Sequence, residues 1–223
     1  MFFPEKITSI RPKDKVLEIG PGGTPHPRSN TFLELKFNTD QEKIAQRGNV
    51  VQEPRFGNRP VHYYDGGKFP FGDAQFDYVI CSHVIEHVAD PAGFLEEIFR
   101  VGSGRGYLEY PLITYEYLYD FDVHLHFVKF DFEEGVLRYL PKRDTAFPEF
   151  SAVTSLFNKT LVRGWDDLCS GNKKLFFEGV EFNQPFVVEK TCELQKLLPD
   201  QSLIVTKKTI RKRVGQILNR LGF

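Results

Sequence analysis

The chain has 223 residues, of which 41% are hydrophobic and 26% are charged, a composition typical of a globular domain. Its 29 basic and 30 acidic side chains nearly cancel, so the overall charge gives no indication of nucleic-acid binding. The first residues lack the pattern of a signal peptide, and no apolar run approaches the ~18 residues of a transmembrane helix. Cys81, Cys169 and Cys192 lack metal-type spacing, and their odd number favours reduced thiols in the cytoplasm.

The N-terminal half alternates strand signals with turn or helix signals, as α/β domains do. Short apolar and β-branched runs bounded by turn residues each predict a strand. The five expected strands are 15–20, 31–36, 60–64, 76–82 and 104–111.

A helix is expected over residues 91–101. Asp90 suits the N-cap, Pro91 suits the first helical position, and Gly102 suits the end of the helix. The apolar positions that would form its buried face are Phe94, Leu95, Ile98 and Val101.

The second half is less regular. Residues 112–150 are rich in aromatic side chains and predict a hairpin-like insertion that covers the site. Helical signal returns over 151–169, and two late strands are expected at 185–190 and 202–207. The residues from 207 to 223 predict a basic amphipathic helix, which would pack by its apolar stripe or contact an anionic membrane surface or a partner protein.

A glycine-rich turn follows the first strand directly. The apolar run from Val16 to Ile19 leads into Gly20-Pro21-Gly22-Gly23, which lets a ligand lie against the backbone at the carboxyl end of a parallel strand. Glycine suits this turn because a Cβ would block the approach and because positive φ is often required. The acidic Glu18 lies two residues before the first glycine. This placement is the main indication of which nucleotide-like ligand is bound.

An NAD-dependent dehydrogenase is the alternative interpretation of this turn. Its fingerprint is Gly-x-Gly-x-x-Gly, so with Gly20 and Gly22 in place a third glycine is due at position 25, where the chain has Pro25. Pro25 and Pro27 also exclude a regular helix after the turn, so the first crossover is expected to be a loop.

Four features occur in order along the chain: the turn after Glu18, Glu34 at the end of the second strand, Asp65 after the third, and a long motif. The motif runs from Phe69-Pro70-Phe71 through Phe76-Asp77 to Ser82-His83-Val84-Ile85-Glu86-His87-Val88. Together these features resemble the class I S-adenosylmethionine-dependent methyltransferases of the small-molecule or glycan branch. The resemblance is strong over residues 14–111.

The resemblance implies roles for six residues in binding S-adenosylmethionine. The glycine turn would hold the methionine part, Glu18 the amino end, Glu34 the ribose hydroxyls and Asp65 the adenine amine. Only 14 residues separate Gly20 from Glu34 here, fewer than the ~20 of related nucleotide sites. The implied cofactor-binding residues are Glu18, Gly20, Gly22, Glu34, Asp65 and Ser82, and the loop residues His26 and Arg28 are possible helpers at the carboxylate end.

Transfer of a methyl group to a hydroxyl gains from a base that removes the hydroxyl proton. The candidates are His83, His87 and His124, with His83 first because it ends the fourth strand; Glu86 is a further candidate. Packing of the following turn is the alternative role for Glu86 and His87.

His124 and His126 alternate, so on a strand they would point to one face and contact substrate, pack or bind a metal. Since the sequence shows no third ligand, no metal is expected. The aromatic side chains of 112–150 would stack on an acceptor or form the core of the insertion, and Glu109 and Tyr110 are candidate pocket residues at the end of the fifth strand.

The resemblance implies one methyltransferase domain over 1–206, with a Rossmann-like seven-stranded mixed sheet in the order 3-2-1-4-5-7-6. It implies methylation of a small molecule or glycan, with an oxygen of a sugar in a bacterial surface polysaccharide as the expected acceptor. A non-catalytic module that only binds S-adenosylmethionine is the alternative from another class.

Overall fold

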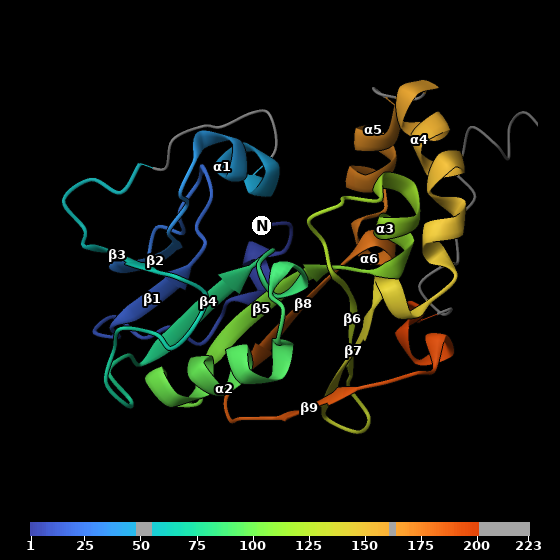
Figure 1. Cartoon of the computed structure of the whole chain (residues 1–223). Helices are drawn as coiled ribbons and strands as arrows, with labels where there is room; N and C mark the ends of the chain where they lie inside the picture. Colours follow the sequence, from blue (N-terminus) through green and yellow to red (C-terminus); the bar gives the residue numbers. More distant parts are fainter. Residues whose placement is uncertain (48–54, 161–163, 201–223) are drawn as a thin grey trace, which may run out of the picture.

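The computed structural model describes residues 1–47, 55–160 and 164–200 (Figure 1). Its main sheet has six strands in the order β3-β2-β1-β4-β5-β8. The first five are parallel, and β8 runs antiparallel to β5. These strands are β1 (Val16–Ile19), β2 (Thr31–Leu35), β3 (Val61–Tyr64), β4 (Tyr78–Ser82), β5 (Gly106–Pro111) and β8 (Phe177–Phe182).

The α/β class, the five early strands and the order 3-2-1-4-5 are confirmed. The prediction of one seven-stranded sheet is wrong for the described residues, which form a six-stranded sheet and a separate three-stranded one. The strand predicted at 202–207 and the helix predicted at 207–223 lie outside the described residues.

The antiparallel edge strand β8 was not expected from the sequence. Its alternating apolar residues are interrupted by Gly179, which weakens the strand signal. The structure shows why glycine stands there, because a Cβ on Gly179 would lie 2.3 Å from the hydroxyl oxygen of Tyr107 on the neighbouring β5. The ring of Tyr107, which is fully buried, therefore occupies the space that a side chain at 179 would need.

The second sheet has the order β6-β7-β9 and holds the predicted insertion. The insertion contains the expected hairpin, β6 (His126–Asp131) and β7 (Val136–Pro141), preceded by a short helix, α3 (Ile113–Tyr119). The strand predicted at 185–190 is β9 (Val187–Lys190), which pairs in parallel with β7 instead of joining the main sheet.

One apolar cluster joins the two sheets. Val128 and Leu137 of the hairpin belong to the same buried cluster as Leu108 of β5 and Val180 of β8. The hairpin therefore contributes to the core of the domain and does not only cover it.

Helix α2 (Pro91–Val101) has the bounds that the sequence predicts. Asp90 caps it by accepting a hydrogen bond from Gly93 N at 3.1 Å, and Phe94, Leu95, Ile98 and Val101 are buried.

The other helices are α1 (Asp40–Arg47), α4 (Ser151–Thr160), α5 (Gly164–Gly171) and α6 (Lys173–Phe176). The 3-10 segments are η1 (Pro4–Lys6), η2 (Ile85–His87), η3 (Lys142–Asp144), η4 (Phe147–Phe150) and η5 (Leu194–Leu197). Among the helices of the described ranges, none has the length and apolar character to cross a membrane.

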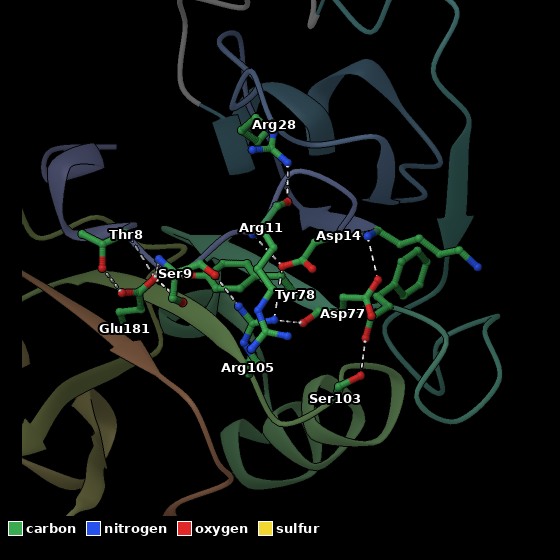
Figure 2. Close-up of polar contacts among 12 residues, drawn as sticks. Thr8, Ser9, Arg11, Asp14, Arg28, Asp77, Tyr78, Ser103, Arg105 and Glu181 are labelled. Carbon is green, nitrogen blue, oxygen red and sulfur yellow. Dashed lines mark hydrogen bonds and ion pairs between the residues drawn. The ribbon is translucent and has the colours of Figure 1, made fainter.

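The segment before β1 packs along the main sheet. Ile7 and Ile10 contact the buried cluster of Val16, Tyr78, Ile80 and Tyr107. Figure 2 shows the polar contacts that hold it, in which Arg105 donates to Asp14 and to the backbone oxygens of Ser9 and Asp77.

Glu181 of β8 fixes the same segment. It accepts hydrogen bonds from Thr8 N and Ser9 N, both at 3.0 Å, and from the Tyr78 hydroxyl at 2.7 Å (Figure 2). Burial raises the pKa of Glu181, but these donors outweigh that effect and hold it below its ordinary value of 4.5.

We expect Glu181→Gln to lower the free energy of unfolding by ~1–2 kcal/mol at pH 7, because the charge-assisted bonds are lost. Since the folded-state pKa is lowered, the contribution of Glu181 is complete above its unfolded pKa, near 4.5, and disappears as the pH falls through the folded value. Urea unfolding at pH 7 and pH 3 measures the difference, with Glu96→Gln on the exposed side of α2 as control. Equal stability of Glu181→Gln and wild type at pH 7 would contradict this role.

Candidate functional site

The glycine turn lies at the carboxyl end of β1 and has the predicted backbone. Gly20 and Gly22 have φ of +59° and +57°, values that side-chain-bearing residues rarely adopt. Gly20 N donates to Leu33 O at 2.9 Å, and a Cβ on Gly20 would lie 2.6 Å from Cγ2 of Val84. Nothing lies within 4 Å of a Cβ built on Gly22, so the turn abuts the loop after β4 on one side and is open on the other.

The first crossover is a loop, as the sequence predicts, since residues 20–30 contain no helix and no strand. Glu18 is buried and accepts a hydrogen bond from His26 N at 2.8 Å. Burial raises its pKa, while Ser29 and the His26 N–H act in the opposite direction. Arg28 donates to Arg11 O at 2.7 Å and so lies toward the N-terminal segment (Figure 2).

The other two predicted cofactor carboxylates lie at the ends of neighbouring strands. Glu34 of β2 is buried and lines a pocket of about 500 Å³ together with Phe56 and Tyr63. Asp65 is exposed directly after β3, and its Oδ1 accepts from Gly67 N at 3.3 Å. The parallel strands thus place the glycine turn, Glu34 and Asp65 along one edge of the sheet.

The end of β4 is organised by the buried carboxylate of Glu109. Ser82 Oγ donates to Glu109 Oε1 at 3.1 Å, and His83 Nε2 lies 3.1 Å from the same oxygen. The Tyr107 hydroxyl donates to Oε2 at 2.6 Å. His83 has φ of +57°, an uncommon conformation for a histidine. Strained backbone of this kind occurs preferentially at functional sites.

Glu109 also binds the N-terminal segment, because Phe2 N and Phe3 N donate to it at 2.7 and 2.9 Å.

Burial lowers the pKa of His83, but the contacts with Glu109 and Glu86 outweigh burial and raise it to about 9. With this raised pKa, a protonated His83 would donate a hydrogen bond to Glu109, so we propose a role as donor rather than as the catalytic base.

A second cluster joins the loop after β4 to the insertion. Glu86, His87 and His124 each offer a ligand atom, and these atoms lie within 4.8 Å of one another. The rings of His87 and His124 are 4.5 Å apart. His124 Nδ1 lies 2.6 Å from Glu116 Oε1, and Lys142 Nζ lies 2.7 Å from Glu116 Oε2.

The expectation that His124 and His126 share one face of a strand is wrong. Strand β6 begins only at His126, and His124 lies in the preceding turn, where its N–H donates to Phe121 O at 3.0 Å. His126 Nε2 instead pairs with Val88 O at 3.0 Å, and its ring contacts Tyr139. Only His124 faces the cluster.

Aromatic side chains border both clusters. Phe2 stacks on Phe177 with ring centroids 3.7 Å apart, and both rings contact His83 edge-on. Along the insertion, Phe121 stacks on Tyr119 and contacts His124. Phe121 remains 38% exposed, so part of this surface is open to a ligand.

Sequence reasoning missed Glu116, Lys142 and Phe177. Glu116 lies among tyrosines in the segment 113–119. Its acidic side chain within the aromatic insertion was the one available sequence signal. The predicted residues fall into two groups. The first group, at the strand ends, consists of the glycine turn, Glu34 and Asp65. The second group, beside Val84, consists of Ser82, His83 and Glu86.

Residues 30–109 match a family model described as a methyltransferase domain. This segment includes β2 to β5 except for the last residues of β5, whereas the glycine turn lies before it. The match agrees, for this segment, with the predicted class of enzyme, a methyltransferase. No curated protein matches the chain.

Solved structures with similarity to the chain include three bacterial proteins. An S-adenosylmethionine-dependent methyltransferase from Thermotoga maritima is 20% identical over 47% of this chain and 46% of its own, with a TM-score of 0.33. The YcgJ protein of Bacillus subtilis is 20% identical over 52% and 53% (TM-score 0.37). An S-adenosylmethionine-dependent methyltransferase from Mesorhizobium loti is 16% identical over 58% and 57% (TM-score 0.34). The chain spans about half the length of these proteins.

The two glycines of the turn offer a matched pair of substitutions. Gly22→Ala adds only the strain of positive φ, about 1–2 kcal/mol, whereas Gly20→Ala adds the same strain and the clash with Val84. We expect Gly20→Ala to lower the free energy of unfolding by at least ~1 kcal/mol more than Gly22→Ala. Denaturant unfolding measures both, and equal losses would show that Gly20 does not abut Val84.

Proposed function

We propose that the chain transfers the methyl group of S-adenosylmethionine to an oxygen of a small molecule or glycan. The observation that carries the proposal is the shared edge of the sheet, where a glycine turn with positive φ, Glu34 and Asp65 follow three adjacent parallel strands. The methyltransferase-domain match to residues 30–109 supports the same reaction class.

The residues present fit the cofactor. The open space at Gly22 admits a ligand against the backbone, and a carboxylate such as Glu34 accepts hydrogen bonds from ribose hydroxyls. Asp65 is exposed at the end of β3, where it is accessible to an adenine amine. Ser82 and the buried Glu18 lie near the carboxyl ends of the adjacent parallel strands β4 and β1.

When bound, S-adenosylmethionine supplies an electrophilic methyl group on a sulfonium. The acceptor oxygen forms a bond to the methyl carbon while the carbon–sulfur bond breaks, and its electron pair stays on sulfur. The hydroxyl proton would pass from the acceptor to solvent water. Because this is an in-line displacement, the main tasks of the protein are to align the two reactants and to exclude water.

Aromatic surface beside His124 supports a glycan as acceptor. The rings of Tyr119 and Phe121 are nearly parallel, and Phe121 contacts the ring of His124 and is 38% exposed. Faces of this kind stack on the apolar faces of sugars. We therefore favour a sugar of a bacterial surface polysaccharide. The three free cysteines agree with a reaction in the cytoplasm.

Calorimetric titration with S-adenosylmethionine tests the cofactor. We expect binding at sub-millimolar ligand, and release of S-adenosylhomocysteine when sugars and nucleotide sugars are supplied. Absence of binding would contradict the proposal. Binding without turnover on the broadest acceptor set would favour a module that only holds the cofactor.

Two conservative variants test the assigned carboxylates. Glu34→Gln and Asp65→Asn each remove a charged acceptor of a hydrogen bond, which is worth about 1.5–3 kcal/mol and corresponds to roughly 10- to 100-fold weaker binding. The matched control is Glu133→Gln in the exposed turn between β6 and β7, which should bind normally. Unchanged affinity in both strand-end variants would remove these residues from the cofactor site.

A further inference from the structure

We propose that Glu86, His87 and His124 form a binding site for a divalent transition-metal cation. Their ligand atoms lie within 4.8 Å of one another, a separation that one ion can bridge. Two imidazoles and one carboxylate form a ligand set suited to first-row divalent cations, and they leave coordination positions open for other oxygens.

The carboxylate of Glu86 is the strongest indication of a missing ligand. Its side chain is completely buried, and its shortest ion pair is longer than the shortest ones of Glu109 and Glu116. The nearest cationic or ionisable nitrogens are His83 Nδ1 at 3.5 Å and His87 Nε2 at 3.9 Å. Buried carboxylates are normally closely paired or bound to a metal, and a cation here would complete the pairing that the two histidines provide at longer distance.

The histidines are also prepared for such a role. His124 Nδ1 pairs with Glu116 at 2.6 Å, an arrangement in which a carboxylate orients a metal-binding imidazole and leaves Nε2 for the ion. Lys142 compensates the second oxygen of Glu116 at 2.7 Å. Nδ1 of His87 is buried without a hydrogen-bond partner.

The fold holds the three ligands together although they come from two distant segments. Leu125 N donates to Glu86 O at 2.7 Å, which joins the turn of His124 directly to η2. A pocket of about 400 Å³, lined by Asp120 and Phe121, reaches the cluster at His124. No metal was expected from the sequence because Glu86 and His87 lie in η2, far before His124 in the chain.

The position suggests what the cation does, and this step rests on the proposed function. Glu86 and His87 follow Val84, which contacts the glycine turn, so the ion would lie on the acceptor side of the cofactor site. A divalent cation bound to the acceptor hydroxyl stabilises its deprotonated form. Such an ion would lower the pKa of the acceptor hydroxyl, so that the proton could pass to water without a histidine base.

Binding of Co²⁺ to the metal-stripped full chain, without S-adenosylmethionine or acceptor, tests the site directly. We expect one equivalent to bind with visible absorption bands typical of nitrogen and oxygen ligands. Glu86→Gln and His124→Ala should weaken binding at least tenfold, and Glu116→Gln, which leaves all three ligands in place, by about 10-fold or more. The control is His62→Ala, an exposed histidine of β3, which should bind as wild type.

No saturable binding at millimolar Co²⁺, or equal affinity in wild type, Glu86→Gln and His124→Ala, would overturn the proposal. Circular dichroism establishes that each variant is folded, and His87→Asn replaces any variant that is not. Because cofactor binding is measured separately, Co²⁺ binding without S-adenosylmethionine binding would remove the proposed function and leave the metal site standing.

Discussion

Compensation of buried negative charge is the constraint on which the candidate site depends. Glu86, Glu109 and Glu116 have no exposed surface, although all three lie near the carboxyl edge of the sheet. Burying a carboxylate is unfavourable unless cations or donors surround it. Glu109 is compensated by His83 and backbone N–H groups, and Glu116 by Lys142. Glu86 has only histidines around it at 3.5 Å or more, and this difference separates the structural carboxylates from the one we assign to a metal.

These charges also determine which parts of the chain meet. Glu109 binds the N-terminal segment to the end of β4, and Glu116 fixes the turn that carries His124. Between them, Val84 packs against Gly20, so the glycine turn and the two acidic clusters share the loop after β4. In the proposed reaction, this loop would therefore contact both cofactor and acceptor. Any change in it should affect both sides of the transfer.

The local parts of this arrangement could be predicted from the sequence, and the long-range parts could not. Pro25 and Pro27 correctly excluded a helix after the glycine turn, and Asp90 with Pro91 correctly began α2. Strand β8 was missed because Gly179, which makes room for Tyr107, weakens the pattern of the strand. The cluster of Glu86 and His124 was missed for a different reason. It depends on backbone contacts between segments nearly 40 residues apart, which no periodicity in the sequence reports. For the same reason the buried state of Glu116 could not be predicted from its neighbours in the chain.

In the proposed site, a methyl donor and a divalent cation bind side by side at this edge of the sheet. The NMR signal of the ¹³C-labelled methyl group of bound S-adenosylmethionine, followed as Mn²⁺ is added, reports this arrangement. We expect strong paramagnetic broadening of this signal in the wild-type protein and little broadening in His124→Ala. A sharp methyl signal in wild-type protein that is saturated with both ligands would contradict it.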